Sequence, residues 1–332
     1  MQLKPINQQV VVIVGASSGI GRDTALAFAA RGAKVAVAAR NRAGLNSLVE
    51  EITRSGGEAI SIPADVADYG QVCAIAQAAD DAFGRIDTWV HNAAVGMVAP
   101  FDEVSIEEFR RVIDVTLMGQ VYGAKVAIPY LQRTGGGSFI SISSMEGRRA
   151  LPLQSAYSTA KHGLEGFIES LRVELEKAGD NINLASIKPA VINTPFYNHA
   201  RTKLGVKPTG IPPYYDPRLV TDAILHVAEH PTRDYIVGDV GRLLDFAQRL
   251  SPELLDRVLV TIGFRGQKTQ DPKDQYAPDN LFEPMSGYEQ VDGDFGNLTV
   301  PSLSDWIRQN PLVSSAVALS TALFGSSKAG KK

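Results

Sequence analysis

The residues of this chain best suited to chemistry are a serine, a tyrosine and a lysine that lie close together, Ser144, Tyr157 and Lys161. Tyr157 and Lys161 are four residues apart, so on a helix their side chains share one face. Ser144 follows an apolar run, 138–142, which is typical of a buried strand. A hydroxyl at the end of a strand can then meet the tyrosine and the lysine of the next helix, at the edge where open α/β sheets bind ligands.

These three side chains suit proton transfer to or from an alcohol or carbonyl oxygen. A free tyrosine has a pKa near ~10, and a neighbouring ammonium favours the phenolate and lowers that pKa. Tyr157 would then be the general acid or base, while Ser144 holds the oxygen. An isolated Tyr-x-x-x-Lys pair is more often a solvated surface feature, so the interpretation depends on the rest of the chain.

Length and composition indicate a globular protein with one large α/β domain or two smaller ones. The chain has 332 residues, of which 44% are hydrophobic and 21% charged, and a net charge of -3 offers no basic footprint for nucleic acid. Cys73 is the single cysteine, which rules out an intrachain disulfide and favours a reducing, cytoplasmic location. The histidines lack metal-ligand spacing, so we expect no metal site. No apolar run reaches the ~18 residues of a transmembrane helix.

A glycine-rich turn near the N-terminus predicts a nucleotide site. A β-branched run, 9–14, leads directly into Gly15-Ala16-Ser17-Ser18-Gly19-Ile20-Gly21, and a helical stretch, 23–31, follows. This order places backbone N–H groups and a helix N-terminus against a diphosphate. We expect Gly15 to permit the tight turn, Gly19 to let the backbone approach the ligand, and Gly21 to allow close packing of helix on strand.

The end of the second predicted strand, 34–38, bears on the choice of cofactor. Dinucleotide folds place an acidic residue there to hold the ribose 2′-hydroxyl. This chain has Ala39 and then Arg40, and a guanidinium suits a 2′-phosphate. We therefore expect NADP(H) to be preferred, with NAD(H) as the alternative. Arg22 and Arg42 remain candidates to share or take the role of Arg40.

Strands and helices alternate along the first hundred residues. The pattern is βαβαβαβ, which predicts an α/β fold with a doubly wound parallel sheet and helices on both faces. We expect a catalytic domain over residues 1–265, an extended or partly disordered linker over 266–301 and a short helical tail over 302–332.

The sequence resembles the short-chain dehydrogenase/reductase family. Five motifs carry the resemblance, in the family's order and spacing over roughly residues 8–240: Gly15-x-x-x-Gly19-Ile20-Gly21, Asp65-Val66, Asn92-Ala93-Ala94, Ser144 and Tyr157-Ser158-Thr159-Ala160-Lys161. The resemblance implies a Rossmann fold of about seven strands, a nicotinamide cofactor and interconversion of a carbonyl and an alcohol by hydride transfer. It also favours a homodimer or homotetramer and a small-molecule substrate.

The resemblance further implies roles for single residues. Asp65 and Val66 would meet the adenine, Asn92 would steady the central strand and the cofactor, and Lys161 would bind the nicotinamide ribose. The backbone of Ile192 would bond the carboxamide. The predicted cofactor-binding residues are Gly15, Ser17, Ser18, Gly19, Ile20, Gly21, Arg40, Asp65, Val66, Asn92, Ala93, Tyr157, Lys161, Pro189, Ile192 and Thr194.

Two positions depart from the family's pattern. Thr116 stands where the family commonly carries an asparagine associated with a water that links the active-site lysine to solvent, and Ala190 replaces the glycine of a Pro-Gly pair. Thr116 is kept as a candidate catalytic residue, and a β-branched packing residue is the alternative. Both departures keep open a second function, a catalytically weakened NADP-binding regulatory or scaffold protein.

The proline-rich stretch after the sixth strand, 196–216, predicts a lid over the substrate. Tyr197, His199, Tyr214 and Tyr215 are candidates to line the pocket, and so are Met145 and either Arg148 or Arg149. A helical region, 241–263, should break at Ser251-Pro252. The apolar tail with its terminal lysines could dock on protein or, less favourably, touch a membrane surface.

Overall fold

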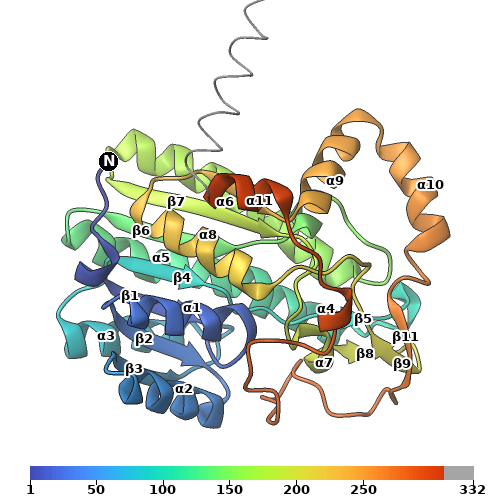
Figure 1. The fold of residues 1–332 in the computed structure, drawn as a ribbon, viewed down its shortest axis with the longest axis horizontal. Helices are drawn as coiled ribbons and strands as arrows, with labels where there is room; N and C mark the ends of the chain where they lie inside the picture. The colour runs from blue at the N-terminus through green and yellow to red at the C-terminus, as the bar shows by residue number, and fades with distance from the viewer. Residues whose placement is uncertain (310–332) are drawn as a thin grey trace, which may run out of the picture.

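A seven-stranded parallel sheet forms the centre of the computed structural model, which describes residues 1–309 (Figure 1). In spatial order its strands are β3 (Glu58–Pro63), β2 (Lys34–Ala39), β1 (Val10–Val14), β4 (Thr88–His91), β6 (Gly137–Ile142), β7 (Ile182–Pro189) and β10 (Asp234–Val237). All neighbouring pairs run parallel. The strand order reverses between β1 and β4, which is where such sheets bind ligands. The predicted fold class is confirmed.

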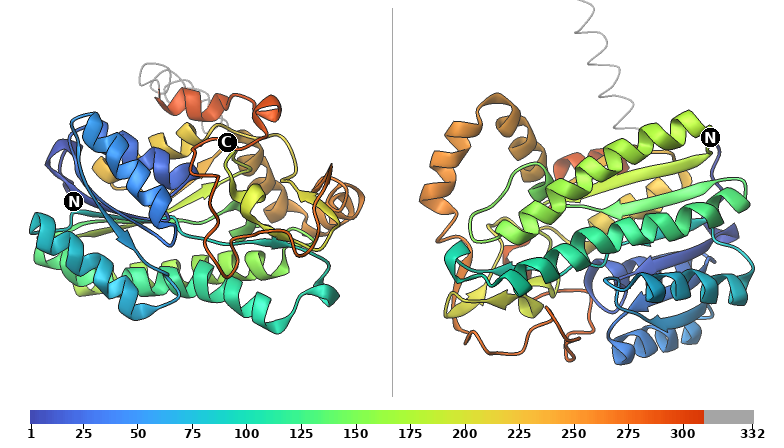
Figure 2. Two further views of the ribbon diagram at one scale, coloured as in Figure 1. Left: turned by 90° about the horizontal axis from the view of Figure 1, so that it is seen from below. Right: turned by 180° about the vertical axis from the view of Figure 1, so that it is seen from behind.

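Both faces of the sheet are covered, so its central strands read as uninterrupted apolar runs. All five residues of β1 are buried, and Val12 pairs with Ala36 of β2 on one side and Trp89 of β4 on the other. The two layers of helices appear in Figure 2. One layer holds α1 (Gly19–Ala30), α2 (Arg42–Arg54) and α8 (Pro217–Glu229); the other holds α3 (Tyr69–Phe83), α4 (Ile106–Ile113), α5 (Gly119–Arg133) and α6 (Ser155–Ala178).

The apolar spacing over 106–131 predicts one long helix, and the backbone is helical without a break from α4 through α5. Ser105 and Glu108, at Ser-x-x-Glu spacing, form a capping box at the start of α4. Between α4 and α5 the backbone makes a π-helical segment, Asp114–Met118. Such segments are rare and often lie at functional sites. This one contains Thr116.

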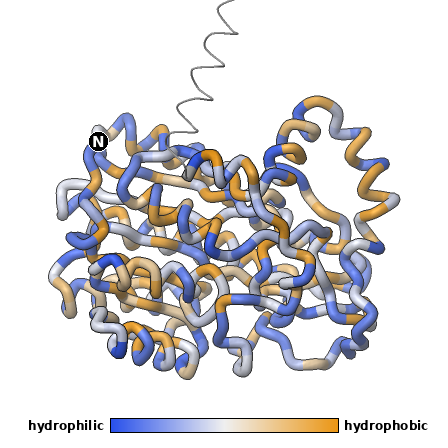
Figure 3. Tube along the Cα trace, viewed as in Figure 1, coloured by the Kyte–Doolittle hydropathy of each residue, from blue (hydrophilic) through white to orange (hydrophobic). Residues whose placement is uncertain are grey.

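Most of the other strands and α-helices gather beyond the carboxyl edge of the sheet. These other elements are β5 (Met97–Val98), α7 (Phe196–His199), β8 (Arg201–Thr202), β9 (Val206–Pro208), α9 (Asp239–Leu250), α10 (Pro252–Ile262), β11 (Lys268–Pro272) and α11 (Leu303–Gln309). Helices α9 and α10 form a hairpin that stands out from the sheet (Figures 1 and 2). The break that separates them lies at Ser251, next to Pro252, as the sequence predicts. Figure 3 shows hydrophobic residues along both helices of the hairpin.

The chain after β11 returns across the carboxyl edge of the sheet. We call residues 279–295 the strap. Its Leu281 is completely buried, and Phe295 packs with Tyr197 and Tyr214. The last described element, α11, is held at the base of α9, because Asp305 accepts a hydrogen bond from the backbone N–H of Gly238 (2.8 Å). The rest of the tail, for which we weighed docking on protein against a membrane surface, lies outside the described residues.

Candidate active site

One cavity at the carboxyl edge of the sheet brings almost all the predicted site residues together. Those that line it are Gly15, Ser17, Ser18, Gly19, Ile20, Arg40, Asp65, Val66, Asn92, Ala93, Ser144, Tyr157, Lys161, Pro189, Ile192 and Thr194. Gly21 and Thr116 do not line it. From the pocket candidates of the sequence, Tyr197, His199, Met145 and Arg149 also face the cavity.

The glycine turn after β1 is as tight as the sequence predicts. Gly15 has φ +85°, and a Cβ there would lie 2.6 Å from the backbone nitrogen of Ala93. A Cβ on Gly21 would lie 2.1 Å from the carbonyl oxygen of Gly15, so this glycine packs α1 against the turn. Because α1 begins at Gly19, its N-terminal N–H groups stand at the cavity. The turn has the shape of a cradle for an anion, and its donors fit a diphosphate.

Asn92 is bonded to this turn, and Asp65, which also lines the cavity, is paired with a helix. The Asn92 side chain donates a hydrogen bond to the carbonyl of Gly15 (3.1 Å), and the Asn92 backbone N–H donates to Val14 (2.9 Å). Asp65 pairs with Arg111 at 2.5 Å. Asn92 therefore ties the end of β4 to the turn after β1, which keeps the cavity wall in register with the sheet.

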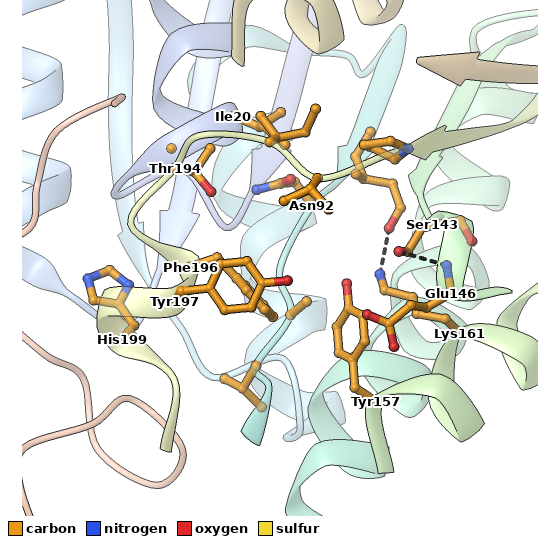
Figure 4. Close-up of a pocket in the computed structure, with 18 of the residues that line it drawn as sticks. Ile20, Asn92, Ser143, Glu146, Tyr157, Lys161, Thr194, Phe196, Tyr197 and His199 are labelled. Atoms are coloured by element: carbon orange, nitrogen blue, oxygen red, sulfur yellow. Dashed lines mark hydrogen bonds between the residues drawn. The ribbon is translucent and has the colours of Figure 1, made fainter. Parts of the chain in front are cut away.

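The serine, tyrosine and lysine converge at the other end of the cavity. Figure 4 shows Tyr157, Lys161 and Glu146 pointing toward one another, with Tyr197 approaching from α7. The Lys161 ammonium donates a hydrogen bond to the carbonyl of Ile142 at 2.8 Å and lies 5.5 Å from the ring centroid of Tyr157. Ser144 accepts a hydrogen bond from the backbone N–H of Glu146 at 3.0 Å. This arrangement can exchange a proton with an oxygen atom placed between Ser144 and Tyr157.

Burial is the largest cause of the pKa shifts of Tyr157 and Lys161. It raises the pKa of Tyr157 well above its usual value, and the negative charge of Glu146 adds to the rise while Ser144 opposes it. Burial also lowers the pKa of Lys161 to about 8, against the attraction of Glu165 and Glu146. The net shift of the Tyr157 pKa is thus opposite to the one expected from an adjacent lysine, because desolvation of the phenolate is its largest cause. At neutral pH Tyr157 therefore keeps its hydroxyl proton.

Glu146 is a member of this group that the sequence analysis missed. Its carboxylate accepts a hydrogen bond from the Ser158 hydroxyl at 2.7 Å, and the residue lines the cavity. Burial raises the pKa of Glu146 to about 8, although Ser158 and Lys161 act in the opposite direction. The available signal was an acidic residue two positions after Ser144, in a stretch that leads into the helix of Tyr157. Without the fold, nothing shows that it is buried.

Thr116 lies behind the cavity wall. Its hydroxyl donates a hydrogen bond to the carbonyl of Val95 (3.0 Å) and accepts one from the N–H of Val95 (3.1 Å), and the residue is fully buried. The side chain thus fastens the π-helical segment to the loop after β4.

Three other pocket candidates lie away from the cavity. Tyr214 and Tyr215 are buried without lining it. The Arg148 guanidinium lies 3.7 Å from Glu165 and within 4.0 Å of Asp245, in an ion-pair cluster beside the site. Of the two arginines considered, Arg149 is the one at the cavity.

The strap contributes a wall of the cavity, whereas the sequence predicts an extended or partly disordered linker over 266–301. Arg40 donates hydrogen bonds to the carbonyls of Phe282 (2.7 Å) and Asn280. The backbone N–H of Gly19 donates to the carbonyl of Gln290 (2.9 Å), and Asn41 donates to that of Met285 (2.9 Å). The strap therefore lies along the end of the cavity formed by the glycine turn and the end of β2, on the donors nearest to the glycine turn.

Arg22, the other candidate partner for a ribose phosphate, is committed elsewhere. Its guanidinium donates to Ser47 (3.1 Å) and pairs with Glu51 (2.6 Å) inside the helix layer. Arg42 is exposed at the start of α2. Within residues 1–309 no cluster of histidine, cysteine and acidic side chains has the arrangement of a metal site, and no helix is long and apolar enough to span a membrane.

Comparison with known proteins places this geometry in a family. A family model described as short chain dehydrogenase matches residues 9–205. The uncharacterized oxidoreductase YxnA of Bacillus subtilis is 36% identical over 330 residues, which is 99% of this chain and 93% of that protein. The chain belongs to the short chain dehydrogenase family of NAD(P)-binding oxidoreductases with a Rossmann fold.

Solved structures agree with this assignment. An alcohol dehydrogenase from the archaeon Thermococcus sibiricus, complexed with 5-hydroxy-NADP, is 26% identical with a TM-score of 0.60, over 69% of this chain and 94% of that one. A 7α-hydroxysteroid dehydrogenase complexed with NADH and 7-oxo glycochenodeoxycholic acid is 23% identical with a TM-score of 0.61, over 70% and 94% of the two chains. The second likeness concerns the fold alone. The two proteins hold different nicotinamide cofactors.

The close approach at the glycine turn makes a first prediction. We expect Gly15→Ala to lower the free energy of unfolding by at least ~2 kcal/mol more than Gly56→Ala, measured by urea denaturation. Both glycines have φ near +85°, but a Cβ on Gly56 meets nothing within 4 Å, whereas one on Gly15 meets the Ala93 backbone. Equal losses in the two variants would show that backbone strain alone, without the clash, sets the effect.

The buried carboxyl of Glu146 makes a second prediction, on pH dependence. Its pKa is about 8 in the folded protein and 4.5 in an ordinary environment, so folding takes up a proton between these values. Glu146 makes its full contribution to the free energy of unfolding below pH 4.5, and this contribution is lost as the pH rises toward 8. Glutamine does not titrate, so the wild type loses this contribution between pH 5 and pH 7.5 and the variant does not. We therefore expect the free energy of unfolding of Glu146→Gln minus that of wild type, measured by urea denaturation at each pH, to increase over this range. The exposed Glu169→Gln is the control, and a pH-independent difference for Glu146→Gln would contradict the assignment.

Proposed function

We propose that this protein is an NADP(H)-dependent oxidoreductase that interconverts a ketone or aldehyde and the corresponding alcohol. The observation that carries the proposal is the convergence of Ser144, Tyr157 and Lys161 at one end of a cavity whose other end is the glycine turn. Bound in this cavity, the nicotinamide cofactor supplies or accepts the hydride. In the reductive direction Tyr157 donates the proton to the substrate oxygen, and Ser144 holds that oxygen by a hydrogen bond.

In this proposal, Lys161 assists proton transfer by Tyr157 in both directions of the reaction. With a pKa of about 8 the ammonium is mostly charged at neutral pH, and it stabilises the tyrosinate left after proton donation. In the oxidative direction the same charge favours the phenolate as base. Thr116 holds the loop after β4 through Val95, so we assign it a positioning role behind the site.

The other end of the cavity holds the cofactor's phosphates and adenosine in this proposal. Gly15, Ser17, Ser18, Gly19 and Ile20 form the diphosphate cradle with Thr194 opposite, and Asp65 and Val66 face the adenine. The nicotinamide ribose and ring are surrounded by Lys161, Asn92, Ala93, Pro189 and Ile192. Gly21 acts through the shape of the turn. The catalytic domain is residues 1–265, and the assembly is a homodimer or homotetramer.

Arg40 supports the choice of NADP(H), although the strap holds it in this structure. Its guanidinium donates hydrogen bonds to two strap carbonyls. The carboxylates of Asp65, Glu283 and Asp279 also attract its positive charge. A 2′-phosphate is a stronger acceptor than a carbonyl, because the hydrogen bond is charge-assisted at both ends. Two of the three carboxylates belong to the strap, so a shift of the strap exposes Arg40 to the phosphate with less competing charge.

The proposed mechanism predicts the behaviour of Tyr157→Phe. Removing the hydroxyl removes the proton donor but leaves the phosphate cradle intact. We expect turnover of carbonyl substrates to fall roughly 1000-fold or more, while the dissociation constant for NADPH changes less than about three-fold. The exposed Tyr276→Phe is the matched control and should behave like wild type. Turnover at the wild-type rate in Tyr157→Phe would rule out this mechanism.

The cofactor assignment predicts a split between the two nicotinamide cofactors. We expect Arg40→Ala to weaken NADPH binding at least about ten-fold and NADH binding less than about three-fold, in fluorescence titrations, since only NADPH carries the 2′-phosphate. Arg42→Ala, two residues away and exposed, is the matched control. If Arg42→Ala produces the split instead, Arg42 is the phosphate ligand. Equal weakening of both cofactors by Arg40→Ala would mean that Arg40 serves to hold the strap.

A further inference from the structure

The cavity continues beyond Tyr157 into a chamber with apolar walls. The hairpin of α9 and α10 supplies one wall, with Leu244, Leu255, Val258, Leu259 and Ile262 among its lining residues. Met145, next to Ser144, lies at its inner end. A pocket of this composition gains binding free energy from apolar area removed from water.

The inner end of the hairpin is fixed close to the reacting groups. The backbone N–H of Val240 donates to the Tyr215 hydroxyl at 3.1 Å. A Cβ on Gly241 would lie 2.9 Å from the Cγ of Met145, so glycine lets α9 approach the loop after Ser144. The outer end is open, with Leu250 74% and Leu254 59% exposed. The chamber therefore runs from Tyr157 toward solvent between helices that offer apolar contacts along their length.

The charged side chains of this end are already paired. Arg149 donates to Gln248 at 3.0 Å and forms an ion pair with Asp256, so the charge of its guanidinium is compensated, while its buried Nε–H has no partner among the described residues. Glu146 is bonded to Ser158 and faces the ammonium of Lys161. A substrate with a carboxylate or phosphate would bring an uncompensated charge into this chamber, which is costly in a desolvated site.

We infer that the substrate is a neutral carbonyl compound or alcohol whose reacting carbon carries a long or bulky apolar group, and that this group lies along the α9–α10 wall. The inference rests on the proposed function, because Tyr157 fixes where the oxygen lies. A short polar carbonyl compound would leave most of the wall in contact with water. Each methylene that reaches the wall should instead raise kcat/KM roughly three- to four-fold, as expected for its transfer from water.

The test is a chain-length series with the full-length protein and saturating NADPH. Alkan-2-ones and straight-chain aldehydes of four to twelve carbons are compared by kcat/KM, together with a six-carbon ketone that ends in a carboxylate, whose short chain keeps the charge near the inner end of the wall. We expect kcat/KM to rise with length over at least four methylenes, and the carboxylate to lower it at least ten-fold relative to the neutral ketone of the same length.

Two valines of α10 provide matched variants. Val258 lines the chamber and is 40% exposed, whereas Val260 is 72% exposed and does not line it. We expect Val258→Asp to lower the ratio of kcat/KM for the ten-carbon ketone to that for the four-carbon ketone at least ten-fold, and Val260→Asp to leave this ratio unchanged. NADPH titration checks that each variant is folded.

The outcomes separate this inference from the function on which it rests. Turnover that does not depend on chain length, or an equal ratio in both variants, overturns the apolar wall and leaves the oxidoreductase proposal standing. Binding of NADPH without turnover of any ketone, aldehyde or alcohol overturns both.

Discussion

The buried ammonium of Lys161 is the feature on which the rest of the site depends. Lys161 is 1% exposed, and a charge removed from water costs several kcal/mol unless nearby groups compensate it. Here the carbonyl of Ile142 accepts its hydrogen bond at 2.8 Å, and Glu165 and Glu146 oppose the fall of its pKa. Because that carbonyl belongs to the end of β6, the same contact fastens α6 to the sheet edge and sets the position of Tyr157.

The compensation of this charge extends across the sheet. Glu165 accepts a hydrogen bond from Ser186 of β7 at 2.7 Å and pairs with Lys188 at 3.0 Å, and Lys188 pairs in turn with Asp234 of β10 at 2.5 Å. Lys188 is 1% exposed, so the chain of charges is largely shielded from solvent until it reaches Asp234. The electrostatics of the site therefore depend on β7 and β10 as well as on the helix that carries Tyr157.

Features set by local pattern could be predicted from the sequence, and features set by distant contacts could not. The covered strands appear as apolar runs. Gly15, Asn92 and Ser144 follow β1, β4 and β6 within one or two residues, so they must lie together at one edge of a parallel sheet. The spacing of apolar residues along the chain does not indicate that Arg40 donates a hydrogen bond to Phe282 or that Glu146 is buried. The expected fall in the pKa of Tyr157 was wrong in direction for a related reason: spacing shows which charge is near, while the extent of desolvation depends on the whole fold.

The strap sets a condition that any cofactor must meet. The N–H of Gly19 has one proton to donate, and in this structure the carbonyl of Gln290 accepts it at 2.9 Å. In the proposed function, a diphosphate oxygen in the cradle would need the same donor, just as a 2′-phosphate would need the Arg40 guanidinium that donates to Phe282 and Asn280. The strap and the phosphates thus compete for identical groups. When the strap moves, its neutral carbonyls lose hydrogen bonds from Gly19 and Arg40, and water can replace these bonds. A phosphate accepts charge-assisted hydrogen bonds from the same donors. This difference favours the phosphates in the exchange, at the cost of moving the strap.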